Sequence, residues 1–141
     1  MTGDPNTVAL DTTVFIYAFE RHPSFGGIAQ SYLSRIEAGG LRGIVSVIVF
    51  TEVLPVYFAR NDAAGARRLE LLLVSIPNLT VVDVSRAISV EAARLRSAYN
   101  LRTPDALHVA TALKSGAGCF VSNDRRLERL SAEGNRIEFA K

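Results

Sequence analysis

The feature that most constrains the fold is an alternation between short apolar segments and longer amphipathic ones. The short segments are rich in β-branched residues, which is typical of strands buried on both faces of a sheet. They run from Thr7 to Leu10, Leu41 to Val45, Leu79 to Val82, Cys119 to Ser122 and Asn135 to Phe139. Because helical segments separate them, neighbouring strands should run in parallel with right-handed crossovers. We predict an α/β fold with three layers, αβα, around a central, mostly parallel sheet of about five short strands, the last at an edge.

Local signals place the helices between these strands. Thr103 and Pro104 are a capping residue and a first-turn proline, and Gly39-Gly40 ends an earlier helix. Pro55 is expected to kink the helix that contains it. The predicted helices cover residues 12–19, 24–38, 46–59, 63–75, 85–99, 103–114 and 124–130.

Composition narrows the class of protein. The 141 residues are 48% hydrophobic, enough for one domain over residues 1–141 with its own core, and no apolar run is long enough to span a membrane. The segment after Met1 lacks the basic and apolar parts of a signal peptide. Cys119 is the single cysteine, so no intrachain disulfide forms. These features predict a cytoplasmic protein.

Five carboxylates stand beside apolar, core-like segments. Asp11, Asp83 and Asp124 each follow a predicted strand, Glu52 lies in the helix after the second strand, and Asp105 lies in a first helical turn. Sites in open α/β sheets form beyond the carboxyl ends of the strands. We therefore expect these acids to approach one edge of the sheet.

Clustered carboxylates require a counter-charge. Four of them within about 5 Å would repel by about 3 kcal/mol per pair, or about 20 kcal/mol in total. Such a group takes up protons or binds a cation, and oxygen ligands favour hard ions such as Mg²⁺ or Mn²⁺. Setting four acids aside leaves 16 basic side chains against 10 acidic ones, a formal charge of +6. An acidic pocket in a basic rim suits a polyanion that also needs a metal ion.

Four sequence blocks carry a family resemblance. They are Leu10-Asp11-Thr12-Thr13-Val14, the segment from Ser46 through Thr51-Glu52-Val53, Arg102-Thr103-Pro104-Asp105-Ala106-Leu107-His108-Val109-Ala110-Thr111-Ala112, and Phe120-Val121-Ser122-Asn123-Asp124. In order and spacing the chain resembles PIN-domain nucleases, most closely the VapC-type toxins of type II toxin–antitoxin systems. The third block is the most specific of the four.

The resemblance implies a site and a chemistry. Asp11, Glu52, Asp105 and Asp124 would be the catalytic and metal-binding acids, with Asp124 the looser fourth member, and they would hold Mg²⁺ or Mn²⁺. Thr13 and Ser122 match polar positions near the acids. The family uses no nucleophilic side chain: water activated by the metal ion cleaves the RNA phosphodiester. Asp83 has no part in this pattern.

Other expectations concern the surroundings of the site. His108 follows Asp105 by three residues on the same side of a helix, which favours a supporting or packing role over a role as a ligand. Arg125 and Arg126, beside Asp124, are candidates for contact with RNA. The resemblance also implies a small antitoxin partner and a homodimer. The helix faces Ile28-Tyr32-Ile36 and Val56-Tyr57-Ala59 are candidate contacts for these partners. The alternative is that these residues belong to the core of the domain.

Three alternatives remain open from the sequence. Asp11, Asp105 and Asp124 are also favourable residues at helix N-termini, and Arg60 is a candidate partner for Glu52. A protein with a nuclease fold can be an inactive binding module, although all four acids are retained here. A phosphatase with an aspartyl nucleophile usually has a second Asp two residues further on, and this chain has Thr13 there.

Overall fold

In the computed structural model, which describes residues 3–133 and 136–139, the centre of the molecule is a parallel sheet. Its strands lie in the order β3-β2-β1-β4-β5, and every neighbouring pair is parallel. They are β1 (Asp4–Leu10), β2 (Arg42–Ser46), β3 (Leu79–Val82), β4 (Ala117–Ser122) and β5 (Arg136–Phe139). The predicted three-layer fold and its edge strand are confirmed.

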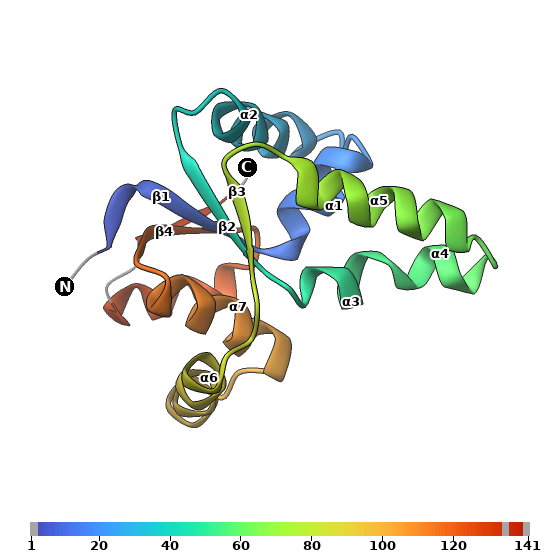
Figure 1. Cartoon of the computed structure of the whole chain (residues 1–141). Coiled ribbons are helices and arrows are strands. Elements are labelled where there is room, and N and C mark those ends of the chain that lie inside the picture. Colours follow the sequence, from blue (N-terminus) through green and yellow to red (C-terminus); the bar gives the residue numbers. More distant parts are fainter. Residues whose placement is uncertain (1–2, 134–135, 140–141) are drawn as a thin grey trace.

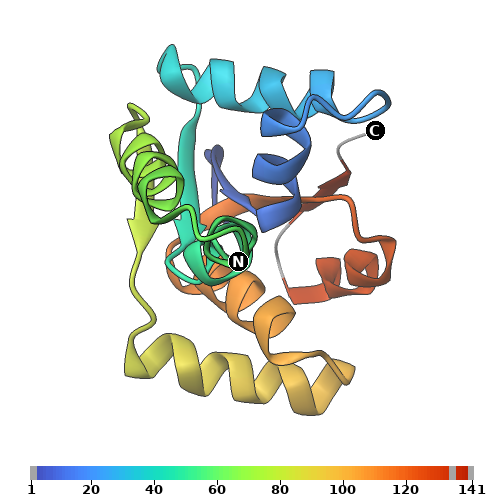
Figure 2. The same cartoon turned by 90° about the vertical axis from the view of Figure 1, so that its right-hand side faces the viewer.

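Helices cover both faces of the sheet (Figures 1 and 2). One face carries α1 (Thr12–Phe19), α2 (Gly26–Glu37), α3 (Val49–Val53) and α5 (Ala63–Ser75), whose buried residues share one core cluster. The other face carries α6 (Arg86–Tyr99), α7 (Thr103–Lys114) and the 3-10 helix η1 (Arg125–Glu133), which share a second. No helix of residues 3–133 has the length and apolarity needed to cross a bilayer.

Pro55 divides a helix that the sequence predicted as continuous. Instead of one kinked helix over residues 46–59, the structure has α3 and a separate α4 (Pro55–Ala59), with Pro55 in the first turn of α4. Proline has no N–H to donate, and its ring clashes with the carbonyl four residues earlier, so the first helix ends before it. The break leaves Glu52 one residue before the end of α3.

The two candidate contact faces differ in exposure. Ile36 on α2 is fully buried, so the face that contains Ile28 and Tyr32 belongs mainly to the core. Val56 on α4 is 47% exposed, and the neighbouring Phe58 is 58% exposed. The α4 face therefore remains available to a partner, and the α2 face does not.

The strand order places a natural site between β1 and β4. The chain moves outward from β1 to β2 and β3, then returns to the opposite side of β1 to form β4. Helices leave the ends of β1 and β4 on opposite faces, which opens a crevice at this position. Leu10 pairs with Val121 at the last step of the β1–β4 ladder, so Asp11 and Ser122 emerge together.

Close backbone contact between β1 and β4 yields a test of the fold. A Cβ added at Gly118 would lie 2.5 Å from the backbone oxygen of Asp4, whereas one added at Gly27 meets nothing within 4 Å. We expect Gly118→Ala to lower the free energy of unfolding by about 1–3 kcal/mol, because backbone atoms cannot easily move aside. The matched Gly27→Ala variant should be neutral or stabilising by up to about 1 kcal/mol. Urea denaturation measures both, and equal stabilities would contradict this packing.

Candidate active site

Asp11 lies at the junction of β1, α1 and β4. Its backbone N–H donates to the carbonyl of Val121 at 2.9 Å, which fixes it beside the end of β4. Its side chain is buried, and its carboxylate accepts a hydrogen bond from the Ser122 hydroxyl at 2.7 Å and a longer one from Thr13 at 3.4 Å. The carboxylate makes no capping bond to α1, so it does not act as the helix cap that the sequence left open.

The environment of Asp11 opposes its charge. Burial raises the pKa of Asp11 and outweighs the opposing effects of His108 and of the hydrogen bonds from Ser122 and from the backbone of Thr12. The nearby carboxylate of Glu52 adds the smallest effect, a further rise. In the described part of the chain its side-chain partners are hydroxyls, which offset little of the cost of burying an anion. A buried carboxylate of this kind is stabilised by a proton or by a cation.

Glu52 is held by a buried pair of residues. Its Oε1 atom accepts a hydrogen bond from the Thr12 hydroxyl at 2.7 Å and lies 2.6 Å from Nε2 of His108. His108 Nε2 also lies 3.0 Å from the Thr12 hydroxyl, so the three groups form a triangle. Burial alone would raise the pKa of Glu52, but the hydrogen bonds from His108 and Thr12 outweigh it and the pKa is lowered. Glu52 is thereby kept ionised.

The triangle restrains only one oxygen of Glu52. Both neighbours contact Oε1, and among the described residues no hydrogen bond reaches Oε2. Thr12 and His108 are 3% and 2% exposed, so packing fixes them and they in turn fix the carboxylate. His108 Nδ1 has no hydrogen-bond partner among the described residues, so the contacts of this ring with Glu52 and Thr12 are made through Nε2.

Arginines contact the other two acids. Asp105 lies in the first turn of α7, 3.2 Å from Nε of Arg102. Asp124 follows β4, and Arg126 binds it through its backbone N–H at 3.0 Å and through Nη2 at 2.6 Å. The hydrogen bond from Arg126 lowers the pKa of Asp124, against a smaller opposing effect of burial. Both acids are therefore neutralised by flexible side chains.

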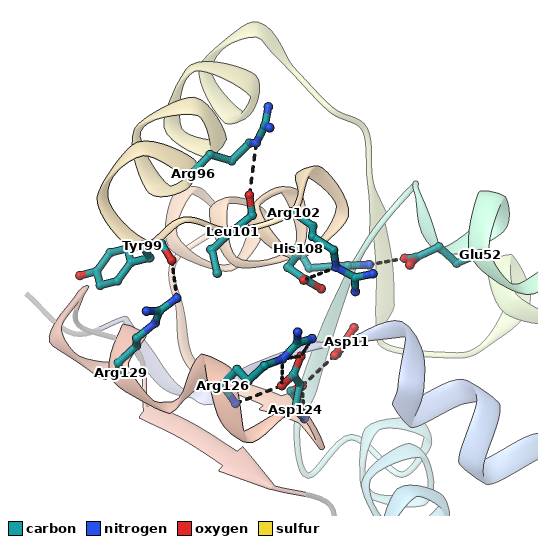
Figure 3. A network of polar contacts seen from close by, with 12 residues as sticks. Asp11, Glu52, Arg96, Tyr99, Leu101, Arg102, His108, Asp124, Arg126 and Arg129 are labelled. Carbon is teal, nitrogen blue, oxygen red and sulfur yellow. Dashed lines mark hydrogen bonds and ion pairs between the residues drawn. The ribbon is translucent and has the colours of Figure 1, made fainter.

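Asp11, Glu52 and Asp124 share one region but do not form a ready cluster (Figure 3), and Asp105 lies beside Arg102 of the same region. Within residues 3–133 and 136–139, no three His, Cys, Asp or Glu side chains converge closely enough to hold a metal ion. The expected gathering within about 5 Å is thus not found in this arrangement. The physical reason is local: Arg102 and Arg126 bind two acids, and His108 and Thr12 hold a third.

The donor chemistry nevertheless fits a hard divalent cation. All four candidate ligands offer carboxylate oxygens, and Asp11 is a buried anion held by hydroxyls. The side chains of Arg102 and Arg126 are both 71% exposed, and ion pairs of this kind contribute about 0–1 kcal/mol. A divalent cation can replace such partners at little cost.

The sequence did not predict the contacts that Thr12, Arg102 and Arg126 make with the candidate ligands. Arg126 was predicted only as a contact for RNA. Thr12 adjoins Asp11 and Arg102 precedes Asp105 by one helical turn, which are the available signals. Asp83 is exposed beyond β3, and no described hydrogen bond joins it to the other acids.

The comparison of the sequence with protein-family models decides the family. The PIN domain model matches residues 8–133, which include all four acids. The chain belongs to the PIN domain family. Comparison with curated protein sequences gives no match.

Solved structures share this PIN fold. VapBC2 from Rickettsia felis, bound to a DNA fragment from its promoter, aligns with 96% of this chain and 99% of its own, with a TM-score of 0.74 and 18% identity. DNA-bound VapBC from Salmonella typhimurium covers 96% and 98%, with a TM-score of 0.67 and 23% identity. VapC20 from Mycobacterium tuberculosis, described as a Sarcin-Ricin loop cleaving toxin, covers 80% and 86%, with a TM-score of 0.61 and 17% identity.

The burial of Asp11 predicts that the site is a source of instability. We expect Asp11→Asn to raise the free energy of unfolding of the metal-free protein by about 1–2 kcal/mol at neutral pH. A raised pKa means that the folded state binds a proton more readily than the unfolded state, so the wild type regains this stability as the pH falls through the folded pKa. The difference in free energy of unfolding between Asp11→Asn and the wild type should therefore become smaller as the pH falls.

Urea denaturation at several pH values measures this effect. Asp83→Asn is the matched control, because Asp83 is exposed, and its change should stay within about 0.5 kcal/mol. A less stable Asp11→Asn protein at neutral pH would contradict the argument.

Thr12 offers a separate test of the hold on Glu52. Thr12→Val keeps the shape but removes the hydroxyl, so the pKa of Glu52 should rise, and the protein should lose about 1 kcal/mol of stability. Thr111→Val is matched, since Thr111 is equally buried but donates to the carbonyl of Leu107. It should cost similar stability without moving the Glu52 pKa, which carboxyl NMR titration measures. Equal pKa values of Glu52 in the two variants would show that the Thr12 hydroxyl does not stabilise the Glu52 carboxylate.

Proposed function

We propose that this PIN-domain protein is a metal-dependent ribonuclease, a hydrolase that cleaves RNA phosphodiester bonds internally and acts as the toxin of a toxin–antitoxin module. The observation that carries the proposal is the buried carboxyl group of Asp11 at the β1–β4 crevice, with Glu52 and Asp124 in the same region (Figure 3). Structural roles alone do not explain a buried anion whose described side-chain partners are hydroxyls.

Asp11, Glu52, Asp105 and Asp124 would hold Mg²⁺ or Mn²⁺. When bound, such an ion supplies an activated water and offsets the charge of the phosphate that is attacked. Ser122 keeps the Asp11 carboxylate in place. Thr12 and His108 keep Oε1 of Glu52 in place, which leaves Oε2 of the same carboxylate to bind the ion. Asp105 and Asp124 complete the oxygen donors once their arginines move away.

The charge distribution supports RNA as the substrate. Arg102 and Arg126 border the acids, and the chain has a net charge of +2 with 14 arginines, whose planar guanidinium groups suit phosphate oxygens. VapC20, which shares the fold, is described as cleaving the Sarcin-Ricin loop, which is an RNA. The same class of substrate is proposed here, with cytoplasmic RNA as the natural target.

A small antitoxin protein is the proposed partner, and the toxin is proposed to form a homodimer. VapBC from Rickettsia felis and from Salmonella typhimurium are toxin–antitoxin assemblies with this fold. A pocket of about 220 Å³ beside Glu52 is lined mainly by apolar side chains, among them Ile16, Val53 and Val56. An apolar helix of a partner placed there would cover the approach to Glu52.

Cleavage assays test the function directly. We expect the purified protein to cut a structured RNA in Mg²⁺ or Mn²⁺ and to lose this activity in a chelator. Asp11→Asn and Asp105→Asn should reduce the rate by at least about 100-fold, equivalent to about 2.7 kcal/mol at the transition state. Asp83→Asn should cleave like the wild type.

Two results would contradict the proposal. Equal cleavage by the wild type and the two site variants would point to a contaminating nuclease. A wild-type melting temperature that Mn²⁺ does not raise, together with no cleavage, would favour a binding module without activity.

A further inference from the structure

Two exposed arginines from different elements approach the acids (Figure 3). Arg102 is the residue that precedes α7, and Arg126 lies near the start of η1. Each side chain is 71% exposed, so neither is fixed by packing. Their ion-pair partners are Asp105 and Asp124, which are two of the four proposed metal ligands.

The charge of the two arginines extends beyond their direct partners. Burial and hydrogen bonds have the largest effects on the pKa of Glu52, and Arg102 lowers this pKa further. The hydrogen bond from Arg126 has the largest effect on the pKa of Asp124, and Arg102 lowers that pKa as well. Arg126 in turn lies within the field of Asp105. The pair therefore supplies positive charge to three of the acids in the protein without a metal ion.

Arg94, Arg96 and Arg129 have partners other than the four acids. Arg129 donates to the carbonyl of Tyr99 and lies over its ring, and Arg96 donates to the carbonyl of Leu101. Arg94 contacts Glu91 and Glu133. A cation bound by the site acids would leave these contacts intact but would compete directly with Arg102 and Arg126.

Guanidinium groups released in this way keep their charge. Arginine is not deprotonated in proteins, and its planar donors bind phosphate oxygens in pairs. The ion pairs that must be broken are formed by arginines that are mostly in solvent, and exposed ion pairs contribute little to stability. The released groups would remain beside the acids, where the scissile phosphate has to bind.

We propose that Arg102 and Arg126 exchange partners: they bind Asp105 and Asp124 in the free protein, and they bind phosphates of the RNA backbone when the acids hold a divalent cation. The inference rests on the proposed ribonuclease function and assigns two substrate-binding residues to it. Removing the arginines should therefore raise the affinity for the metal ion, with which they compete, and lower the affinity for RNA, which they help to bind.

The test uses the double variant Arg102→Gln/Arg126→Gln. Without RNA, its affinity for Mn²⁺, measured by titration calorimetry, should increase about 5–10-fold, since two competing charges are gone. In Ca²⁺, its affinity for a fluorescent single-stranded RNA should fall about 10-fold or more, and gels verify that the RNA stays intact. The slope of log affinity against log salt should become shallower by about 1.4, the value for two lost phosphate contacts.

Matched variants separate this role from a merely structural one. Arg67→Gln removes an exposed ion pair with the same spacing as Arg102 and Asp105, that of Arg67 with Glu70 on α5, and should change neither affinity. The double variant Arg102→Lys/Arg126→Lys keeps both charges, so it should retain the wild-type salt slope.

The outcomes distinguish this inference from the function on which it rests. If the wild type binds Mn²⁺ and RNA but the Gln double variant matches it in either affinity, the exchange is wrong and the proposed function stands. If the wild type binds neither ligand, both fail. An increase in Mn²⁺ affinity together with a shallower salt slope for RNA would support the exchange.

Discussion

The burial of the Asp11 carboxylate is the constraint on which the rest of the site depends. The β1–β4 ladder fixes its backbone, α1 starts immediately after it, and the Ser122 hydroxyl holds its oxygen at 2.7 Å. Removing an anion from water costs several kcal/mol, and hydroxyl donors return only part of that. The fold tolerates this cost because two core clusters, one on each face of the sheet, stabilise the strands that carry Asp11 and Ser122.

The neighbouring acids have their own local partners, and this explains why no metal-binding group is preassembled among residues 3–133 and 136–139. Glu52 is bound by Thr12 and His108, whereas Asp105 and Asp124 are bound by arginines. Four ionised carboxylates placed together without a cation would repel by about 20 kcal/mol, more than a domain of this size can absorb. Local partners separate the charges, so the arrangement of the free protein is the one that electrostatics favours.

The sequence predicted the backbone of this site better than its side-chain contacts. The order of strands predicted that Asp11 and Asp124 follow neighbouring strand ends, and the structure has them there, because the carboxyl ends of parallel strands share one end of the sheet. The break at Pro55 was underestimated, since whether a proline bends or ends a helix depends on packing around it. The contact of Thr12 with Glu52 joins residues 40 positions apart, and no local pattern specifies such a pair.

Burial divides the site into a fixed half and an exchangeable half. The Asp11 carboxylate and Oε1 of Glu52 are held by Ser122, Thr12 and His108, which are all 3% exposed or less and are therefore fixed by packing. Asp105 and Asp124 are held by two arginines that are mostly in solvent, where rearrangement costs little. A site that must be stable while empty and still accept a cation and a polyanion needs both properties. The fixed half preserves the geometry, and the exchangeable half supplies counter-charge in each state.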